Sequence, residues 1–264
     1  MTSTLQRRRL LKLLGMSFLG TSFSSCVTSP ARATTVNWGY IGKTGPANWG
    51  ELSPEFQLCQ IGRQQTPIDL QIADVKNAHS KNQDLLVINY QPTALHLINN
   101  GKTIQVNYKT GSYLKYAHQS FELLQFHFHH FSEHRINGKS YDMELHFVHR
   151  SQTGNLAVMG VFLQAGAFNP ALQIIWDAMP QQQGLETRIE DINIDASQFL
   201  PAEHRFLTYS GSLTTPPCSE NVLWCVMETP IEASRSQIAK FSQIFPHNAR
   251  PLQPRNDRVV IEVL

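Results

Sequence analysis

Apolar and polar residues alternate with a period of two along much of the chain, and this pattern predicts a β-rich fold. Segments with β-branched or aromatic residues between turn signals lie at residues 85–90, 103–108, 121–131, 141–150, 156–164, 222–228 and 258–264. The last of these segments is apolar and ends the chain, so we expect the C-terminus to be threaded into the sheet.

Helical patterns are few. Asn169 and Pro170 precede an expected helix over residues 171–178, since proline is favoured in a first turn. Residues 232–245 have apolar positions near helical spacing and end before Pro246, which predicts a second helix. No repeat or linker divides residues 34–264. We therefore predict an α+β, β-rich fold: a single domain around a large, twisted, mostly antiparallel sheet with a few peripheral helices.

The first 33 residues have a different composition from the rest. They hold five basic residues and no acidic one. Arg7, Arg8 and Arg9 precede an apolar run over residues 10–23 that is short for a membrane span. Ala31-Arg32-Ala33 then has the small-x-small pattern of a signal-peptide cleavage site. We interpret residues 1–33 as an export signal with a twin-arginine-like start, and residues 34–264 as a periplasmic or extracellular domain without a membrane span. An alternative processing site at Cys26 would leave a lipid anchor.

The bulk composition excludes some classes of protein. Hydrophobic residues make up 41% and charged residues 16% of the 264 residues, as in a globular protein. Without the first 33 residues the chain holds 17 basic and 20 acidic residues, a net charge of −3. This mild acidity gives no electrostatic basis for binding nucleic acid.

Three cysteines follow the export signal, and an oxidising compartment permits a bridge between two of them. Cys225 lies in an apolar, strand-like run and is expected to be a buried free thiol. Cys59 and Cys218 lie in polar, turn-rich surroundings, so we expect them to pair, although sequence alone does not fix the connectivity.

Histidines concentrate between residues 125 and 149. His127 and His129 alternate with two phenylalanines, so on a strand both imidazoles point to one face. An Asn137-Gly138 reversal precedes a second alternating segment, and pairing of the two segments would bring His146 beside the first two rings. Three neutral imidazoles and a water molecule are the ligands of a catalytic zinc, and its full charge lowers the pKa of that water to about 7.

Metal-bound histidines also need an acceptor for their second nitrogen. Gln125 and Glu144 each precede a histidine by two positions, so both are expected on the ligand face. The spacing alone leaves alternatives open. With 11 histidines in the chain a His-x-His pair arises readily by chance, the alternating face could be a solvated strand, and periodicity does not choose among the three rings named and His130, His134 and His149.

Several motifs together resemble the alpha class of carbonic anhydrases, in particular its secreted bacterial branch, in which a bridge equivalent to Cys59–Cys218 is usual. They follow the family's order from Trp38 to the C-terminus. They are Trp38-Gly39-Tyr40, Gly45-Pro46 with Trp49, Gln64-Gln65-Thr66-Pro67-Ile68, Asn99-Asn100-Gly101, Phe126-His127-Phe128-His129, Ser132-Glu133-His134, Glu144-Leu145-His146-Phe147-Val148-His149, Ser210 through Cys218, and Asn248-Ala249-Arg250-Pro251.

The resemblance implies a zinc enzyme that interconverts CO2 and bicarbonate, with His127, His129 and His146 as zinc ligands. Thr214 would accept a hydrogen bond from zinc-bound hydroxide and donate its own proton to Glu133, which fixes the direction of the nucleophile's lone pair. The other residues implied at the site are Thr215 for contact with substrate, Tyr40 and Asn100 around the ligands, and Val148, Val158, Leu213, Val222 and Trp224 as an apolar pocket wall suited to CO2.

The sequence departs from the family at the proton shuttle. Fast members carry a histidine directly after Asn-Asn-Gly, where this chain has Lys102. An amine with an ordinary pKa near 10.4 is a poor proton acceptor at neutral pH unless burial lowers that pKa. We expect proton release to limit turnover in weak buffer. His96 is the nearest other histidine along the chain. His130, a second departure, is expected to point away from His129.

Other functions predict different features. A non-catalytic binding module of this family would have lost a zinc ligand, and all three histidines are present. A zinc hydrolase for peptides or esters would carry His-Glu-x-x-His or a carboxylate ligand, which this segment lacks. A zinc reservoir would bind metal without hydrating CO2. Ligand type alone leaves cobalt and iron open.

Overall fold

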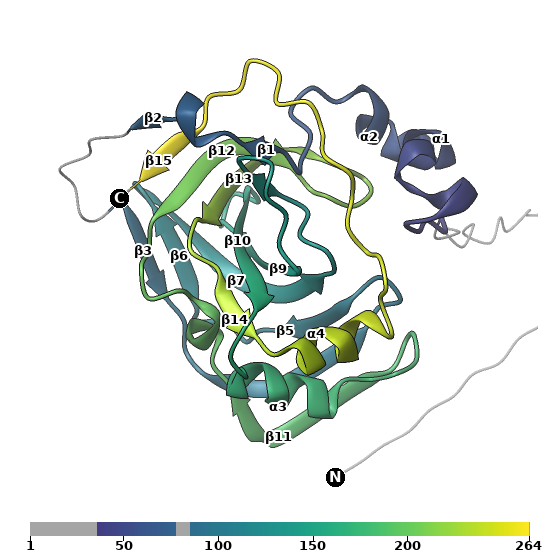
Figure 1. Cartoon of the computed structure of the whole chain (residues 1–264), viewed down its shortest axis with the longest axis vertical. Coiled ribbons are helices and arrows are strands. Elements are labelled where there is room, and N and C mark those ends of the chain that lie inside the picture. The colour runs from purple at the N-terminus through teal and green to yellow at the C-terminus, as the bar shows by residue number, and fades with distance from the viewer. Residues whose placement is uncertain (1–35, 78–84, 264) are drawn as a thin grey trace, which may run out of the picture. The chain divides into compact units, whose positions relative to one another are not determined.

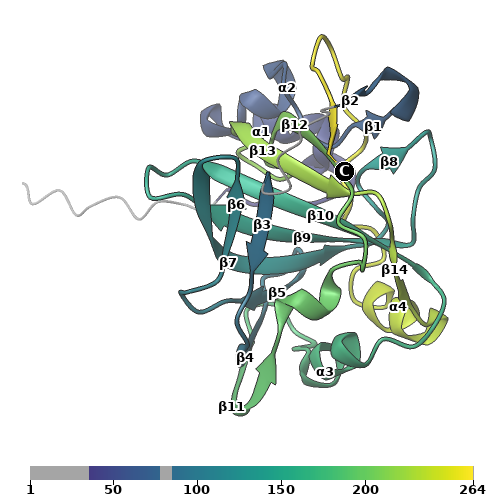
Figure 2. The same ribbon diagram turned by 90° about the vertical axis from the view of Figure 1, so that its left-hand side faces the viewer.

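A mixed sheet of thirteen strands forms the centre of the molecule (Figures 1 and 2). The structure, a computed structural model, describes residues 36–77 and 85–263. Ten strands follow one another across the sheet in the order β11-β4-β5-β7-β9-β10-β13-β12-β15-β2. Their bounds are β2 (Lys76–Asn77), β4 (Thr93–Asn99), β5 (Ile104–Asn107), β7 (Gln119–His129), β9 (Met143–Arg150), β10 (Leu156–Ala165), β11 (Glu186–Ile194), β12 (Phe206–Ser212), β13 (Glu220–Met227) and β15 (Ile261–Val263).

Three shorter strands complete the sheet: β3 (Leu86–Asn89) pairs with β6 (Tyr113–Tyr116), β6 also pairs with β7, and β14 (Ile231–Ala233) pairs with β10. Most neighbours are antiparallel, but β10 runs parallel to β13 and β14, and β15 runs parallel to β2. Two further strands, β1 (Asp69–Leu70) and β8 (Arg135–Ile136), form a small parallel sheet of their own. The predicted fold class, β-rich around one large sheet, is confirmed.

Helices are short and lie around the sheet. They are α1 (Trp49–Leu52), α2 (Leu58–Ile61), α3 (Pro170–Ala178) and α4 (Arg235–Ser242). Figures 1 and 2 show α3 and α4 side by side, with α1 and α2 at the opposite end of the sheet. The rings of Trp176 on α3 and Phe241 on α4 stack at 5.3 Å, and Trp176 also meets Phe128 of β7 at 4.8 Å. These contacts fasten both helices to the core on one face of the sheet.

The predicted helix over residues 232–245 begins too early. Ile231–Ala233 form β14, which pairs with β10, and the helix starts only at Arg235. Ser234 sets this boundary, because its side chain accepts from the backbone of Gln237 while the Gln237 side chain accepts from the backbone of Ser234. This capping box satisfies amide groups that the helix itself leaves unpaired.

A bulge in β7 decides which side chains face the core. Phe121 and Leu123 are buried in the main hydrophobic core, and so are Phe126 and Phe128, although the interval from Leu123 to Phe126 is odd. The pairing with β9 shifts between Leu123 and Gln125, where one extra residue is accommodated. Residues 125, 127 and 129 therefore share the opposite face. The strand ends at His129, two residues before the predicted end.

The C-terminal strand β15 lies between β12 and β2, so the chain end is threaded into the sheet as predicted. A disulfide joins Cys59 on α2 to Cys218, just before β13, and Cys225 is a buried free thiol. In the part of the chain that the structure describes, no helix is long and apolar enough to cross a membrane. The predicted export signal and Cys26 lie outside the described residues.

Candidate metal centre

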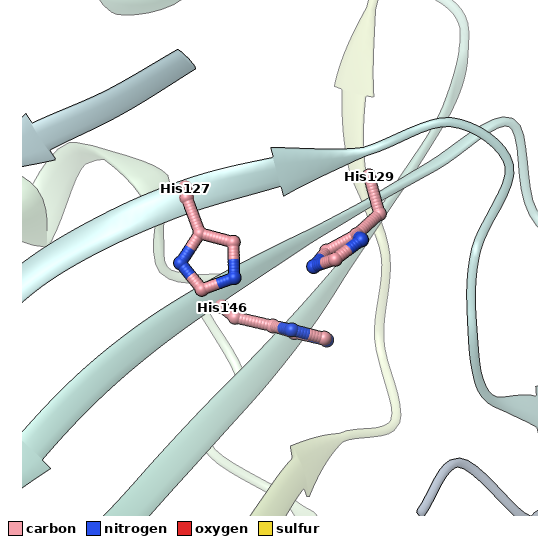
Figure 3. A group of neighbouring side chains, drawn as sticks. All are labelled: His127, His129 and His146. Atoms are coloured by element: carbon pink, nitrogen blue, oxygen red, sulfur yellow. The ribbon is translucent and has the colours of Figure 1, made fainter. Parts of the chain in front are cut away.

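Three imidazole rings converge on the face of the sheet opposite the main core. His127 and His129 project from β7, and His146 projects from β9, directly across from His127 in the strand pairing. The ring centroids lie 5.0 Å apart for His127 and His129, 5.5 Å for His127 and His146, and 4.5 Å for His129 and His146 (Figure 3). One nitrogen of each ring lies within 4.8 Å of the others. The strand pairing expected from the Asn-Gly reversal brings these rings together.

The second nitrogen of each ring has an acceptor from the chain. These contacts fix the tautomer of each imidazole and leave the other nitrogen free to bind a metal. The contacts are Nδ1 of His127 to Oε1 of Gln125 at 2.9 Å, Nδ1 of His129 to the carbonyl oxygen of Asn248 at 2.7 Å, and Nε2 of His146 to Oε1 of Glu144 at 2.8 Å. The free nitrogens are therefore Nε2 of His127, Nε2 of His129 and Nδ1 of His146.

The free nitrogens have the properties of metal ligands. Among the residues that the structure describes, Nε2 of His129 is buried without a hydrogen-bond partner, which is costly unless something binds there. Burial, followed by the neighbouring His129 and His146, lowers the pKa of His127 well below its ordinary value, and burial lowers the pKa of His129. Neutral imidazole is the form that binds metal. Three such nitrogens without a carboxylate fit a catalytic zinc ion.

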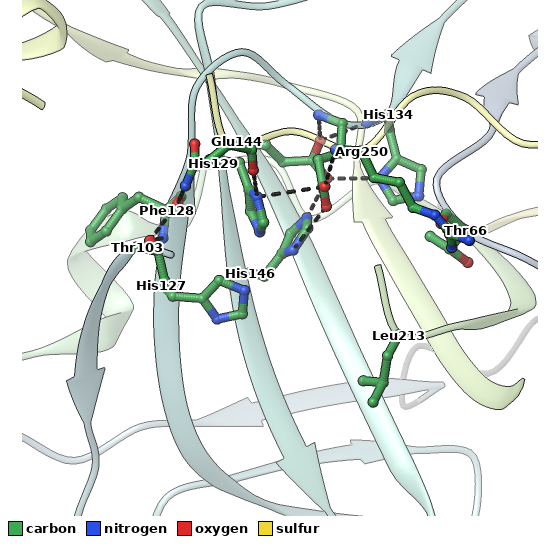
Figure 4. A network of polar contacts seen from close by, with 12 residues as sticks. Thr66, Thr103, His127, Phe128, His129, His134, Glu144, His146, Leu213 and Arg250 are labelled. Carbon is green, nitrogen blue, oxygen red and sulfur yellow. Dashed lines mark hydrogen bonds and ion pairs between the residues drawn. The ribbon is translucent and has the colours of Figure 1, made fainter. Parts of the chain in front are cut away.

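Glu144 organises a buried polar network behind His146 (Figure 4). Its Oε1 accepts from His146 and from Nδ1 of His134 at 2.7 Å, and its Oε2 accepts from the backbone amides of Glu133 and His134 at 2.8 Å each. Burial alone would raise the pKa of Glu144, but the two imidazoles and their hydrogen bonds lower it well below its usual range. His134, Glu144 and His146 also lie within metal-binding distance of one another, but their atoms already satisfy one another by hydrogen bonds.

Glu133 lies next to the ring cluster with one oxygen free. Its Oε1 accepts from the backbone amide of Arg250 at 2.7 Å and lies 3.6 Å from Nδ1 of His129. Its Oε2 is buried and, within residues 36–77 and 85–263, has no hydrogen-bond partner. Thr214 is buried too, with 5% of its surface exposed. The Thr214 hydroxyl makes no hydrogen bond with Glu133 in this structure, so the contact that the resemblance implies between them stays a prediction.

Comparison with known proteins agrees with this geometry. Residues 44–263 match the model of the eukaryotic-type carbonic anhydrase family. A carbonic anhydrase of Nostoc sp. (strain PCC 7120) is 83% identical over 264 residues, all of both chains, and one of Pectobacterium atrosepticum is 40% identical over 90% of this chain and 95% of its own. The chain belongs to the alpha carbonic anhydrase family. The solved alpha carbonic anhydrase of Thermovibrio ammonificans, in complex with the inhibitor sulfanilamide, covers 86% of this chain and 100% of its own at 43% identity and a TM-score of 0.82.

The residues expected to form the apolar wall of a carbonic anhydrase pocket lie together. Val158, Val222 and Trp224 are buried in one cluster, with the half-buried Val148 and Leu213 packed against it. The Trp224 ring lies 4.9 Å from the ring of His146 and donates from Nε1 to the carbonyl oxygen of Ser212 at 2.9 Å. This cluster is separate from the main core and borders the histidines. Thr215 is half-buried in the loop held by Cys218, whose amide donates to the Thr215 carbonyl oxygen at 2.9 Å.

Lys102, which the sequence resemblance places at the family's proton-shuttle position, contacts Trp38. Its ammonium group donates to the carbonyl oxygen of Trp38 and lies 4.9 Å from the centre of the Trp38 ring. Burial lowers the pKa of Lys102. Tyr40 packs against Trp38 at 5.6 Å, and burial, then the charge of Glu133, raises its pKa well above the ordinary value. Asn100 contacts none of the ligands, but its Nδ2 lies 3.4 Å from Oε1 of Gln105, which faces His127 across the strands.

Two residues of the site were not assigned a role from the sequence. The carbonyl oxygen of Asn248 orients His129, and His134 shares Glu144 with His146 while its Nε2 accepts from the hydroxyl of Tyr209 at 2.7 Å. Both belong to motifs that carry the family resemblance, so a signal was present. His130 lies apart from the ligands, because its Nδ1 bonds the carbonyl oxygen of Pro246 at 2.9 Å.

Proposed function

We propose that the protein catalyses the zinc-dependent, reversible hydration of CO2 to bicarbonate, with His127, His129 and His146 holding the metal. The observation that carries this proposal is the set of tautomers. Each ring donates a hydrogen bond from one nitrogen to an acceptor of the chain at 2.7–2.9 Å, and the three remaining nitrogens face one another. Zinc bound there would supply an activated water molecule as nucleophile at neutral pH.

Residues around the ligands provide orientation and a place for the substrate. Thr214 would donate its proton to the free oxygen of Glu133 and so present a lone pair toward the site, which would orient the nucleophile. The apolar wall formed by Val148, Val158, Leu213, Val222 and Trp224 suits CO2, which has no net charge or dipole. Thr215 would bind the bicarbonate product beside it.

We propose further that residues 1–33 direct export and that the protein works in the periplasm or outside the cell. The disulfide between Cys59 and Cys218 is compatible with this location, since such bridges persist in oxidising compartments. A lipid anchor at Cys26 is an alternative fate of the same segment. Mass spectrometry of the protein isolated from its own cells separates a chain that begins at Thr34 from a lipid-modified one.

Stopped-flow CO2 hydration on the chain from Thr34 onward tests the function. We expect fast hydration that disappears when a chelator removes the metal and returns with zinc. His129→Ala should lose stoichiometric zinc and hydration, whereas the matched variant His130→Ala should keep both, because His130 bonds Pro246 and not the ligand cluster. One tightly bound zinc ion without hydration would overturn the proposal and favour a zinc-storage or binding role. Return of activity with cobalt or iron, but not with zinc, would correct the identity of the metal and leave the proposed reaction unchanged.

A further inference from the structure

Each hydration of CO2 by one water molecule yields bicarbonate and one proton, and that proton must reach the solvent before the next turnover. Lys102 does not present a free amine for this step, because its ammonium group is held by the carbonyl oxygen and the ring of Trp38. We propose that His96 accepts the proton released by the reaction and passes it to solvent at Glu186. This inference rests on the proposed function.

The first argument is the face of the sheet. Leu95 and Leu97 of β4 lie in the main core together with Val106 of β5 and Phe126 of β7. Side chains alternate along each strand, so His96 points to the opposite face, the one that carries His127. β4, β5 and β7 are neighbours in the sheet. Two strand spacings, about 10 Å, therefore separate His96 from Gln125, and His127 lies two residues further along β7, at about 12 Å. A few water molecules span this distance.

The second argument is a row of polar side chains between the two histidines. Nδ2 of Asn107 lies 3.3 Å from Nδ1 of His96, and Oδ1 of Asn107 accepts from Nε2 of Gln105 at 2.6 Å. Gln105 is paired with His127 across the strands, and Asn107 is paired with Gln125. This row gives water molecules donors and acceptors along the whole interval from the ligands to His96.

The third argument is the setting of the His96 ring. Nε2 lies 2.9 Å from Oε2 of Glu186, so the neutral ring carries its proton on Nε2 and offers the lone pair of Nδ1 toward Asn107 and the site. A proton that arrives at Nδ1 makes an imidazolium ion, which the Glu186 carboxylate stabilises. Loss of the Nε2 proton through Glu186, whose side chain is 55% exposed, delivers one proton to solvent. Rotation of the ring, or proton exchange with water, then restores the starting tautomer.

The charges around the ring allow the proton to leave again. Nη2 of Arg188 lies 3.4 Å from each ring nitrogen, and its positive charge opposes the attraction of Glu186 for an imidazolium ion. Lys109 and Glu190 line a cavity of about 190 Å³ together with His96, Asn107 and Arg188. Water in that cavity reaches the ring directly. The His96 side chain itself is only 19% exposed, so the ring bridges a protected interior and the solvent.

The experiment compares zinc-loaded parent, His96→Ala and His118→Ala at rising buffer concentration. His118, an exposed histidine in the turn before β7, is the matched control. We expect His96→Ala to lower kcat roughly tenfold or more in weak buffer, the scale of a positioned proton acceptor. Its kcat/KM should stay unchanged, because this ratio reflects only the steps up to the hydration of CO2, which come before proton release. Added imidazole should restore kcat. An unchanged kcat in His96→Ala at every buffer concentration would overturn the inference and leave the proposed function intact, whereas a zinc-loaded parent without hydration would overturn both.

A second measurement does not depend on turnover. In NMR spectra of ring-labelled protein, with and without zinc, the resonance missing in His96→Ala identifies His96. We expect the ring-nitrogen shifts to show the neutral tautomer with its proton on Nε2, because that nitrogen lies 2.9 Å from Oε2 of Glu186. A neutral ring with its proton on Nδ1 would contradict the proposal, because it would offer no lone pair toward Asn107 and the site.

Discussion

Glu144 accepts a hydrogen bond from Nε2 of His146 at 2.8 Å, which leaves Nδ1 of that ring free for the proposed metal. The same oxygen also accepts from His134, and the second oxygen accepts from two backbone amides. Four donors on one buried carboxylate hold it in place and keep it ionised. The orientation of His146, a proposed zinc ligand, thus depends on a carboxylate that is not one of the proposed ligands.

We therefore expect Glu144→Gln to weaken zinc binding about 10–100-fold, because a neutral amide accepts more weakly and places an NH2 group against a donor. Competition with a chromophoric chelator measures the affinity. Glu122→Gln is the matched control, since Glu122 lies on β7 on the far side of the bulge from the ligands. Equal zinc affinities of Glu144→Gln and the control would show that this carboxylate does not support the ligand.

The sequence predicted that His127 and His129 share one face of a strand, because the alternation of side chains along a strand depends only on neighbouring residues. The bulge in β7 lies before Gln125, so alternation holds through His127 and His129. Partners from distant parts of the chain were not predictable in this way. The acceptor for His129 is Asn248, 119 residues further along, and spacing says nothing of such a contact.

Strand β11 was not predicted either. Most of its residues are at least partly exposed, and its register with β4 shifts between Ile189 and Asn193, so the alternation along it is weak and interrupted. Ile231–Ala233 of β14 were not predicted as a strand, and residues 232 and 233 were assigned to the start of a helix. Their strand pairing is with β10, more than sixty residues earlier in the chain, and the local pattern does not show such a partner. Local propensity gives way to tertiary pairing at such positions.

Lys102→His should raise kcat in weak buffer by about tenfold, because an imidazole with an ordinary pKa near 6.5 replaces an amine held by Trp38. The value of kcat/KM should stay the same. The gain should persist when the substitution is made in His96→Ala, since the new histidine offers its own route for the proton. Stopped-flow hydration over a buffer series measures both constants. If kcat stays at the parent level in weak buffer, proton release is not the slow step.

The disulfide between Cys59 and Cys218 closes a loop with a sequence separation of 159. The double variant Cys59→Ser/Cys218→Ser should lower the free energy of unfolding by about 2–5 kcal/mol, since the bridge restricts the unfolded chain. Urea unfolding of the chain from Thr34 onward measures the change. Dithiothreitol should bring the parent to the stability of the variant and leave the variant unaffected. A parent that is no more stable than the variant without reductant would show that the bridge does not stabilise the fold.

Cys225 should resist thiol reagents in the folded protein. Burial raises the pKa of its thiol to about 12, and the thiolate is the reactive form. Labelling of the chain from Thr34 onward with iodoacetamide at pH 8 should modify almost no protein, whereas labelling in denaturant should modify one thiol per chain. Two or three reactive thiols per chain in denaturant, without reductant, would instead show that Cys59 and Cys218 are not bridged.

Buried His149 should make stability depend on pH. Its ring is fully buried between the hydroxyl of Tyr90 at 2.8 Å and the carbonyl oxygen of Ala157 at 3.3 Å, and burial lowers its pKa to about 4. In the unfolded chain the pKa is near 6.5. Between these two values the unfolded state binds more protons than the folded state, so stability is complete above about pH 6.5 and is lost as pH falls toward 4.

The difference of roughly 2.5 pKa units corresponds to about 3 kcal/mol at full effect. Urea unfolding at a series of pH values compares the parent with His149→Gln, which keeps an amide for hydrogen bonding but does not titrate. We expect a lower stability of the variant at pH 7 and a shallower loss between pH 6.5 and 4. His118→Gln, at an exposed position, should keep the slope of the parent. The proposed zinc ligands are the same in all three proteins, so their own pH dependence cancels in the comparison. Equal slopes in His149→Gln and the parent would mean that the ring is already protonated inside the core, with Tyr90 and Ala157 both accepting from it.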